Sequence, residues 1–386
     1  MTPDTSPATL VQYVLWGGLL IGLAFGAVGQ MTRFCVRGAI ADWVIFRGPT
    51  RAIAWFVAIA VGALCVQLLV ATGQIDASRT LGWASRLPWA SYLGGGLLFG
   101  YGMVLCGGCP QRSLVKAGSG NLKAVVTLLV VAIAALMTLR GLLASLRVAA
   151  FDRWTVDLST PQDIGSLLGP WVGMSPAGMR WLAVALLVAV VGWLAIRARR
   201  SLDAPSVLGG AFVGLLVGAA FYVTGRVGFL AEHPETLEAA WLGTATRRPE
   251  GLSFSAPMGH WLDLMTLWTD KGTVPTFGVL VALGVIAGAF LSAKLRGDFR
   301  LEMFASPREF GEHLVGGVLM GFGGITALGC SIGNGVTGMA LLSTGAMLAV
   351  AGIVAGAWAA LAVQSRRALR DDAPAGRPQV TVHAAH

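Results

Sequence analysis

Nine apolar segments, each near the length that crosses a lipid bilayer, dominate this sequence of 386 residues. A membrane-spanning helix needs roughly 20 apolar residues, and runs of this kind lie at 10–29, 51–72, 92–106, 122–142, 180–197, 207–224, 276–293, 312–329 and 336–363. Composition agrees, because 55% of the residues are hydrophobic and only 12% are charged. The sequence therefore predicts an all-α polytopic membrane protein with about nine transmembrane helices.

The basic residues indicate how these helices are oriented. Of the 28 Lys and Arg residues, 18 fall in alternate connections, which are the inner ones if the N-terminus lies outside. We therefore expect an outer N-terminus, an inner C-terminus and a basic cytoplasmic tail at 364–386. The net charge is +9, but the basic residues lie between apolar segments and not on one soluble face, so the charge does not predict a nucleic-acid partner. The segment MTPDTSPATL has no basic region and does not read as a signal peptide.

An internal repeat divides the chain into two halves. Five residues of the run 96–112 recur at an offset of 221 in the run 317–333: Gly96, Gly100, Gly102, Gly108 and Cys109 match Gly317, Gly321, Gly323, Gly329 and Cys330. Equivalent points lie five spans apart, so the halves have opposite directions, as in many secondary transporters. We predict a single transmembrane domain, 1–363, with a repeat half at 10–142, a connecting span at 180–197 and a repeat half at 207–363.

The five cysteines differ in what their surroundings predict. An odd number of cysteines spread through apolar sequence indicates free thiols. Cys65 has apolar neighbours and reads as a packing residue. The CGGC motif has no second Cys pair or His cluster, so a metal site is not expected. A redox pair of Cys106 and Cys109 stays open, although the repeat matches Cys106 with Ala327 and leaves the second half without that thiol.

Cys35, Cys109 and Cys330 share one setting, because each ends an apolar run beside glycines. A thiol suits a soft sulfur atom, and a broken helix offers free N–H groups to an anion. We predict short re-entrant helices after the breaks, beginning at Pro110 and in GNGVTG (333–338), and no cofactor. The expected substrate-binding residues are Cys35, Cys109, Cys330, Gly100, Gly102, Gly108, Gly321, Gly323, Gly329, Asn334 and Arg37.

Charged groups near these motifs are few. Arg37, Arg112 and Lys116 either attract an anion at the inner mouth or follow the inside-positive bias, and the sequence does not decide between the two. No carboxylate lies well inside a predicted span, and a phosphate-binding loop of the Walker type is not found. The segment WLDLMTLW (261–268) predicts a helix at the membrane interface.

Three motifs together resemble the YeeE/YedE family of membrane proteins, over about 17 to 363: FCVRGAIADW, FGYGMVLCGGCPQRSLVKAGSGNLK and GFGGITALGCSIGNGVTG. The characterised members are bacterial thiosulfate transporters. The resemblance implies inverted helical halves that narrow to an hourglass, with Cys35, Cys109 and Cys330 passing thiosulfate along by S–H contacts. It also implies a bacterial inner-membrane location and a small cytoplasmic sulfur carrier of the TusA type as a partner.

Three further hypotheses remain beside an importer of thiosulfate or a related sulfur anion. Cys106 and the long segment between the halves look more like the YedE branch, which implies a selenium compound as an alternative substrate. A membrane thiol oxidoreductase would use Cys106 and Cys109. A membrane scaffold for a sulfurtransferase would tolerate changes at all three cysteines. We favour the transporter, which is not an enzyme.

Overall fold

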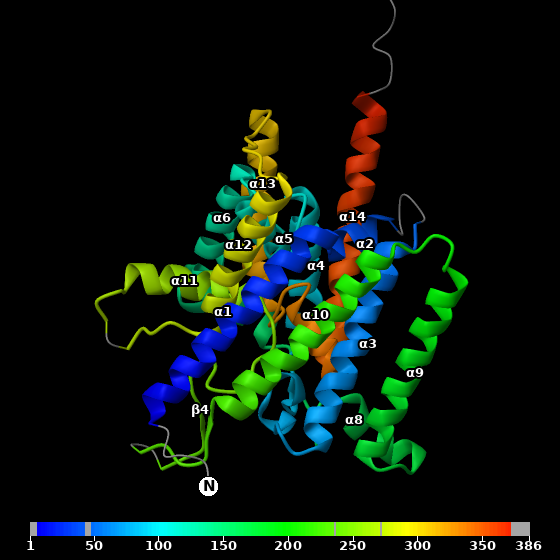
Figure 1. Cartoon of the computed structure of the whole chain (residues 1–386), viewed down its shortest axis with the longest axis vertical. Helices are drawn as coiled ribbons and strands as arrows, with labels where there is room; N and C mark the ends of the chain where they lie inside the picture. The colour runs from blue at the N-terminus through cyan, green and yellow to red at the C-terminus, as the bar shows by residue number, and fades with distance from the viewer. Residues whose placement is uncertain (1–5, 43–47, 235–236, 271, 372–386) are drawn as a thin grey trace, which may run out of the picture.

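The computed structural model describes residues 6–42, 48–234, 237–270 and 272–371, and these form a helical bundle (Figure 1). The long helices are α1 (Pro7–Thr32), α3 (Thr50–Ala71), α4 (Trp89–Leu105), α6 (Leu122–Arg140), α9 (Pro176–Arg197), α10 (Ala204–Tyr222), α12 (Phe277–Arg296), α13 (Pro307–Thr326) and α14 (Thr344–Asp371). The shorter ones are α2 (Val36–Ala41), α5 (Pro110–Gly118), α7 (Leu142–Arg147), α8 (Ile164–Val172) and α11 (Ala256–Thr266).

Single turns and very short strands complete the chain. The turns are the 3₁₀ segments η2 (Ala77–Arg79) and η3 (Leu81–Trp83) and the π-helical segments η4 (Val148–Asp152), η5 (Val223–Val227) and η6 (Gly333–Gly338). Two antiparallel pairs of strands lie in the loops: β1 (Arg86–Leu87) with β2 (Val156–Asp157), and β3 (Phe229–Leu230) with β4 (Ala240–Trp241). The prediction of an all-α polytopic membrane protein is confirmed.

Eight of the described segments are long and apolar enough to span a membrane. The expected span at 312–329 is not among them, because α13 begins with the polar turns of Pro307–Glu312 and ends at Thr326. The expected span at 336–363 begins later, at Thr344, since η6 and a turn occupy the first residues. Of the predicted tail, 364–371 continues α14 and 372–386 lies outside the described residues.

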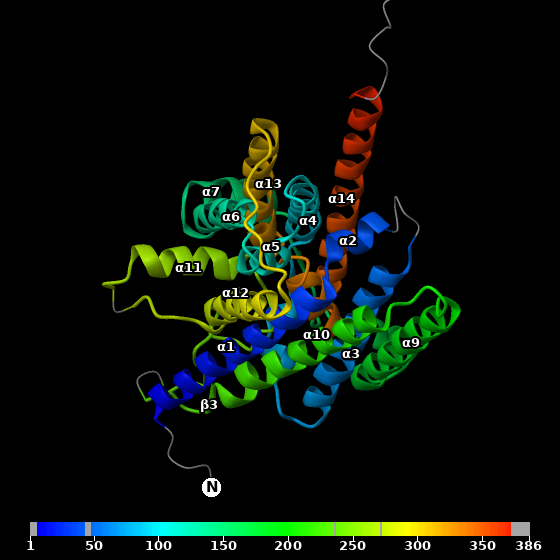
Figure 2. The ribbon, with the colours of Figure 1, turned by 45° about the horizontal axis from the view of Figure 1, so that its top comes forward.

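The ends of the helices define two faces of the molecule. The N-terminal face carries the start of α1, the end of α3 and the loops 72–88 and 228–255, at the bottom of Figure 1. The C-terminal face carries the loops 119–121 and 297–306 and the end of α14, at the top. Helix α9, the predicted connecting span, lies at the edge beside α3 (Figure 2). The distribution of Lys and Arg predicts that the N-terminal face lies outside the cell.

The two halves repeat the same helix pairings. In the alignment of the repeats, α1, α3, α4 and α6 correspond to α10, α12, α13 and α14. Helix α1 packs on α12 and α3 packs on α10, while α4 packs on α14 and α6 packs on α13. Each pair therefore joins one element from each half, and its mirror pair exchanges the two, as the predicted inverted repeat requires.

Glycines allow these crossings to be close. A Cβ added to Gly26 of α1 would meet the backbone oxygen of Val285 in α12, and one added to Gly210 of α10 would meet the backbone oxygen of Ala54 in α3. Small residues let helix backbones approach where lipid supplies no hydrophobic drive for association. Much of the glycine content of this chain is thus explained by helix packing.

The broken helices are fixed by one loop at each face. At the C-terminal face, the amide of Leu122 donates to the carbonyl of Glu302 at 2.9 Å. At the N-terminal face, the amide of Ile164 donates to the carbonyl of Leu342 at 3.0 Å. These contacts tie the starts of α6 and α14, which are equivalent in the repeat, to chain segments outside the bundle core.

Candidate functional site

The same backbone conformation precedes Cys35, Cys109 and Cys330. Each comes two residues after a residue in the left-handed conformation that ends a helix: Arg33 (φ 53°) before Cys35, Gly107 (φ 64°) before Cys109, and Leu328 (φ 56°) before Cys330. A left-handed residue turns the chain sharply at a helix C-terminus. The structure thus places all three cysteines at interruptions of helices, as the sequence predicted.

We name residues 106–109 the first break and residues 327–330 the second break. Their hydrogen bonds match: the amide of Gly108 donates to the carbonyl of Met103 at 3.0 Å, and that of Gly329 donates to the carbonyl of Gly324 at 2.9 Å. Bonds of this kind close the last turn of a helix that stops at a left-handed residue. After the first break the chain restarts as α5 with Pro110 in its first position, as predicted.

The thiols at these breaks are buried and close to one another. Cys109 and Cys330 have no exposed surface, and Cys35 is partly buried. Cys109 lies within electrostatic range of both Cys35 and Cys330, so the three sequence motifs meet in space. The described structure has all five cysteines as free thiols.

Hydrogen bonds show how the thiols are oriented. Cys35 Sγ accepts from the amide of Gly38 at 3.4 Å, and Cys330 Sγ accepts from the amides of Phe254 and Gly333, both at 3.3 Å. Because sulfur acts as the acceptor there, the S–H proton of each thiol remains available to a substrate. Cys109 Sγ lies 3.8 Å from Gln111 Oε1, a long contact in which the thiol is the donor.

Cys106 and Cys65 belong to helix packing. Cys106 Sγ donates to the carbonyl of His313 on α13 at 3.3 Å, so its partner differs from that of Cys109. Cys65 lies against Gly218 of α10. Of the two thiols in CGGC, the structure brings only Cys109 to the other cysteines.

The predicted glycines separate into two groups. Gly100, Gly102, Gly321 and Gly323 lie in helix crossings, where an added Cβ would meet Ile353, Gly316, Val131 or Gly95 respectively. The structure therefore gives them a packing role, and substrate binding by these four glycines stays a prediction. Gly108 and Gly329 lie within the two breaks and directly precede Cys109 and Cys330.

Asn334 has a structural role in the described structure, and its expected substrate contact stays a prediction. Its Nδ2 donates to the carbonyls of Ala327 at 2.9 Å and Gly329 at 3.0 Å. Both amide protons are therefore used to hold the second break. An unpaired carbonyl at a helix end is costly inside a membrane, and Asn334 satisfies two of them.

Basic side chains gather on the side of the first break that faces the C-terminal face. Arg112 Nη1 donates to the carbonyl of Gly29 at 3.2 Å, and Lys116 Nζ donates to the carbonyl of Gly107 at 3.0 Å. Arg37 Nε is buried without a hydrogen-bond partner, and Arg37 and Arg112 both interact with Lys116. Cations this close repel one another, so the group favours an anion.

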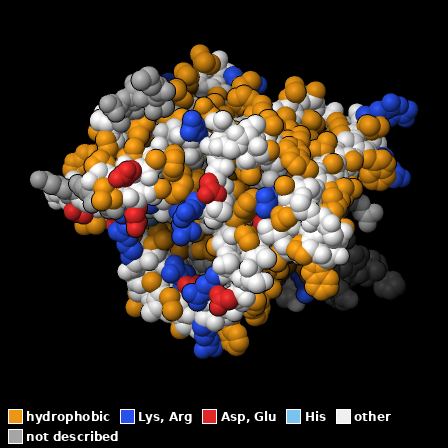
Figure 3. Space-filling view, turned by 90° about the horizontal axis from the view of Figure 1, so that it is seen from below, with side chains coloured by type: hydrophobic (Ala, Val, Ile, Leu, Met, Phe, Trp, Pro, Cys, Tyr) orange, Lys and Arg blue, Asp and Glu red, His pale blue; other side chains and the backbone are white. Residues whose placement is uncertain are grey.

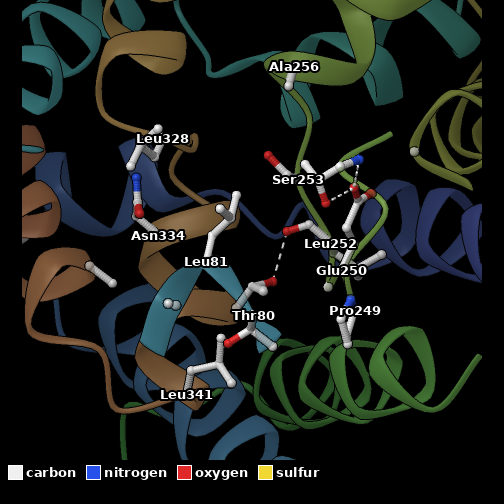
Figure 4. A pocket seen from close by; sticks show the side chains of 18 of the residues that line it. Thr80, Leu81, Pro249, Glu250, Leu252, Ser253, Ala256, Leu328, Asn334 and Leu341 are labelled. Atoms are coloured by element: carbon white, nitrogen blue, oxygen red, sulfur yellow. Dashed lines mark hydrogen bonds between the residues drawn. The ribbon is translucent and has the colours of Figure 1, made fainter. Parts of the chain in front are cut away.

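A pocket of about 170 Å³ leads toward the second break from the N-terminal face. Figure 4 shows its lining, with Thr80 and Leu81 opposite the segment 249–253, and Leu328 and Asn334 at one end. Thr337 Oγ1 donates to the carbonyl of Leu252 at 2.8 Å, which ties that segment to η6. Seen from this face, acidic and basic side chains lie close together (Figure 3).

One carboxyl group lines this pocket. Glu250 is half-buried, and its Oε1 accepts from the amide of Thr246 at 2.7 Å and from the Thr246 hydroxyl at 2.6 Å. Burial raises the pKa of Glu250 above its ordinary value of 4.5, and the bonds from Thr246 oppose that shift. The charge of the pocket wall therefore changes at a higher pH than that of an exposed glutamate.

Two functional candidates were missed at the sequence level. Gln111 and Ser331 each follow a cysteine closely and are buried, and Gln111 Nε2 and Ser331 Oγ have no hydrogen-bond partner. The signal was a polar residue within two positions after a cysteine in a broken helix. Within the described part of the chain, no cluster of His, Cys, Asp and Glu side chains is suited to a metal ion.

Comparison with known proteins identifies the family of this chain. The family model described as Sulphur transport, which represents the YeeE/YedE proteins, matches residues 31–359. The chain belongs to this family. The predicted resemblance is confirmed, and so is the prediction that the protein is a transporter and not an enzyme.

Two relatives of the family share most of their length with this chain. Thiosulfate transporter TsuA of Escherichia coli (strain K12) is 26% identical over 358 residues, which cover 90% of this chain and 94% of that protein. Thiosulfate transporter TsuA of Spirochaeta thermophila (strain ATCC 700085 / DSM 6578 / Z-1203) is 27% identical over 369 residues, covering 92% and 100%. The match extends across both breaks.

Proposed function

We propose that this protein imports thiosulfate, or a closely related sulfur anion, across the bacterial inner membrane through a constriction lined by Cys330, Cys109 and Cys35. The observation that carries the proposal is the convergence of these three thiols at helix interruptions in the buried centre of the molecule. The names of the two relatives support the substrate.

The proposed route begins in the pocket of the N-terminal face. That pocket is lined by Leu328 of the second break and by Asn334 of η6, and Cys330 lies between these two residues in the sequence. The anion then contacts Cys109 and leaves past Cys35 into the basic group of Arg37, Arg112 and Lys116. Weak S–H contacts hold a polarizable sulfur atom without trapping it, which permits release toward the next thiol.

The direction of import rests on the distribution of charge. A cationic mouth on the C-terminal face would lie in the cytoplasm if the inside-positive bias holds. A cytoplasmic sulfur carrier of the TusA type would then receive the anion from this face. Labelling of a single cysteine introduced at Arg200, an exposed residue of the loop 198–203, by a membrane-impermeant reagent in spheroplasts and in inverted vesicles tests this orientation.

A growth assay tests the transport function. We expect Cys109→Ala to abolish growth on thiosulfate in cells that lack other thiosulfate uptake, while the variant is still found in the membrane at the level of the wild-type protein. The control is Cys65→Ala, which removes a thiol from the packing of α3 on α10 and should support growth. Growth with Cys109→Ala would contradict the thiol path.

The redox alternative predicts a different pattern. A Cys106–Cys109 disulfide in turnover would make Cys106→Ser as harmful as Cys109→Ser. The proposed path predicts a mild effect at Cys106, because its thiol bonds to the carbonyl of His313. The selenium alternative is tested by adding selenite and sulfite as competitors of labelled thiosulfate.

A further inference from the structure

Two buried polar groups beside the central thiols have no hydrogen-bond partner. They are the Ser331 hydroxyl, with 1% of its residue exposed, and the Gln111 Nε2 amide group, with 0% exposed. Buried polar groups almost always find partners, since an unpaired one costs free energy, and the penalty is larger where no water can reach. Unpaired donors at such a place are suited to a ligand.

Both groups face the same thiol from opposite halves of the molecule. Gln111 follows the first break, and its Oε1 lies 3.8 Å from Cys109 Sγ. Ser331 follows the second break, and its side chain lies near enough to Cys109 to act on that thiol as a hydrogen-bonding group, although its hydroxyl completes no hydrogen bond of normal geometry. The two donors therefore lie at the point where the path passes from Cys330 to Cys109.

The repeat shows why the two donors differ. At the offset of 221, Ser331 corresponds to Pro110, which has no side-chain donor, and Gln111 corresponds to Ile332, which has none either. Each half thus supplies one donor within two residues of its cysteine. The two half-sites become one site only when the halves pack together.

We infer that Ser331 and Gln111 bind the oxygen atoms of the substrate while Cys109 and Cys330 contact its terminal sulfur. This assignment rests on the transport function proposed above and narrows the substrate to an oxyanion that carries one soft atom. Hydroxyl and amide protons are stronger donors than a thiol, and hydrogen bonds to charged oxygens are the stronger class. A sulfur anion without oxygen would leave both donors unpaired and would be disfavoured.

The test measures uptake of labelled thiosulfate, at a concentration below KM, by proteoliposomes that contain purified Ser331→Ala protein. We expect uptake to fall about tenfold or more, the loss that follows from removing one hydrogen bond to a charged group. Ser331→Thr keeps the hydroxyl and should retain most of the uptake. The matched control is Ser292→Ala, which changes a buried serine on α12 outside both breaks.

A second readout separates binding from folding. Because the Ser331 hydroxyl has no bond to lose in the free protein, Ser331→Ala should unfold at a temperature no lower than that of the wild-type protein. Uptake by Ser331→Ala within twofold of wild type would overturn the assignment, and so would a parallel loss of uptake and thermal stability. Failure of the wild-type protein to move thiosulfate would instead overturn the transport function, and the assignment with it.

Discussion

The first and second breaks share a backbone and differ in charge. In both, a left-handed residue precedes the cysteine by two positions, and an equivalent backbone hydrogen bond closes the last turn of the preceding helix. The first break continues into α5, which carries Arg112 and Lys116, whereas the second continues into η6, whose sequence GNGVTG has no charged residue. The two breaks therefore have matching backbone geometry and different electrostatics.

On the proposed path, this difference would give an anion a direction. A neutral break beside the pocket of the N-terminal face would let an anion approach without holding it, and a cationic break beyond it would draw the anion onward. Some residues shape the backbone of the breaks, and others would act on the substrate, so substitutions of the two kinds should have different effects.

The largest effect should come from the cysteines, because they are the part that the two breaks share. Cys330→Ala and Cys109→Ala should each reduce thiosulfate uptake by proteoliposomes to the level of empty liposomes, since either change removes one contact of a single path. A variant that retains more than half of wild-type uptake at one of the two positions would show that the breaks are not equivalent in function.

Removing positive charge near the first break should make its electrostatics more like those of the second break and should slow uptake. Arg37→Gln deletes a cation whose Nε is buried and unpaired, and we expect uptake to fall about tenfold, which corresponds to ~1.4 kcal/mol. The loss should be greatest at low ionic strength. Arg200→Gln changes an exposed arginine of the loop 198–203 and is the control; an equal effect of both substitutions would indicate a general effect of net charge.

The pocket beside the second break should respond to pH through Glu250. Because the folded protein raises the pKa of this carboxyl, it favours the protonated form, and that stabilisation is lost as pH rises above 4.5 through the folded pKa. The carboxylate formed there also repels an entering anion. Uptake and thermal stability should both decline over this interval, and Glu250→Gln should flatten the two profiles. Unchanged profiles in Glu250→Gln would exclude this group as the cause.

The smallest effect concerns the left-handed residues. Gly107→Ala places a side chain where φ is 64° and should cost about 1–2 kcal/mol of folding free energy. Leu328 already bears that strain at φ 56° and its side chain is half exposed, so Leu328→Gly should not destabilise the protein. Thermal unfolding in detergent measures both; destabilisation by Leu328→Gly would mean that its side-chain contacts outweigh the strain.

Much of this architecture could be predicted from the sequence, because apolar length and glycine spacing are properties of the chain itself. The spans, the inverted repeat and the interruptions at Cys35, Cys109 and Cys330 follow from those patterns. The start of α14 could not be placed, since the apolar sequence after Cys330 does not distinguish a π-helical turn from the helix that follows it.

The glycines and Asn334 show what the sequence could not predict about the candidate site. A glycine that lets two helices cross and one that lines a path look the same in a sequence, and only the structure shows that Gly100 and Gly321 lie in helix crossings. The sequence also could not predict that the amide protons of Asn334 bond to two carbonyls of the second break. Ser331 and Gln111 emerged from the opposite observation, an absence of partners around buried atoms.

We propose that this protein alone moves a sulfur anion along its buried thiols. The decisive measurement is uptake of labelled thiosulfate by proteoliposomes that contain only this protein, with wild type, Cys109→Ala and Cys65→Ala compared at equal protein content. We predict uptake by wild type and Cys65→Ala and none above background by Cys109→Ala. Uptake by Cys109→Ala at the wild-type rate would contradict the claim.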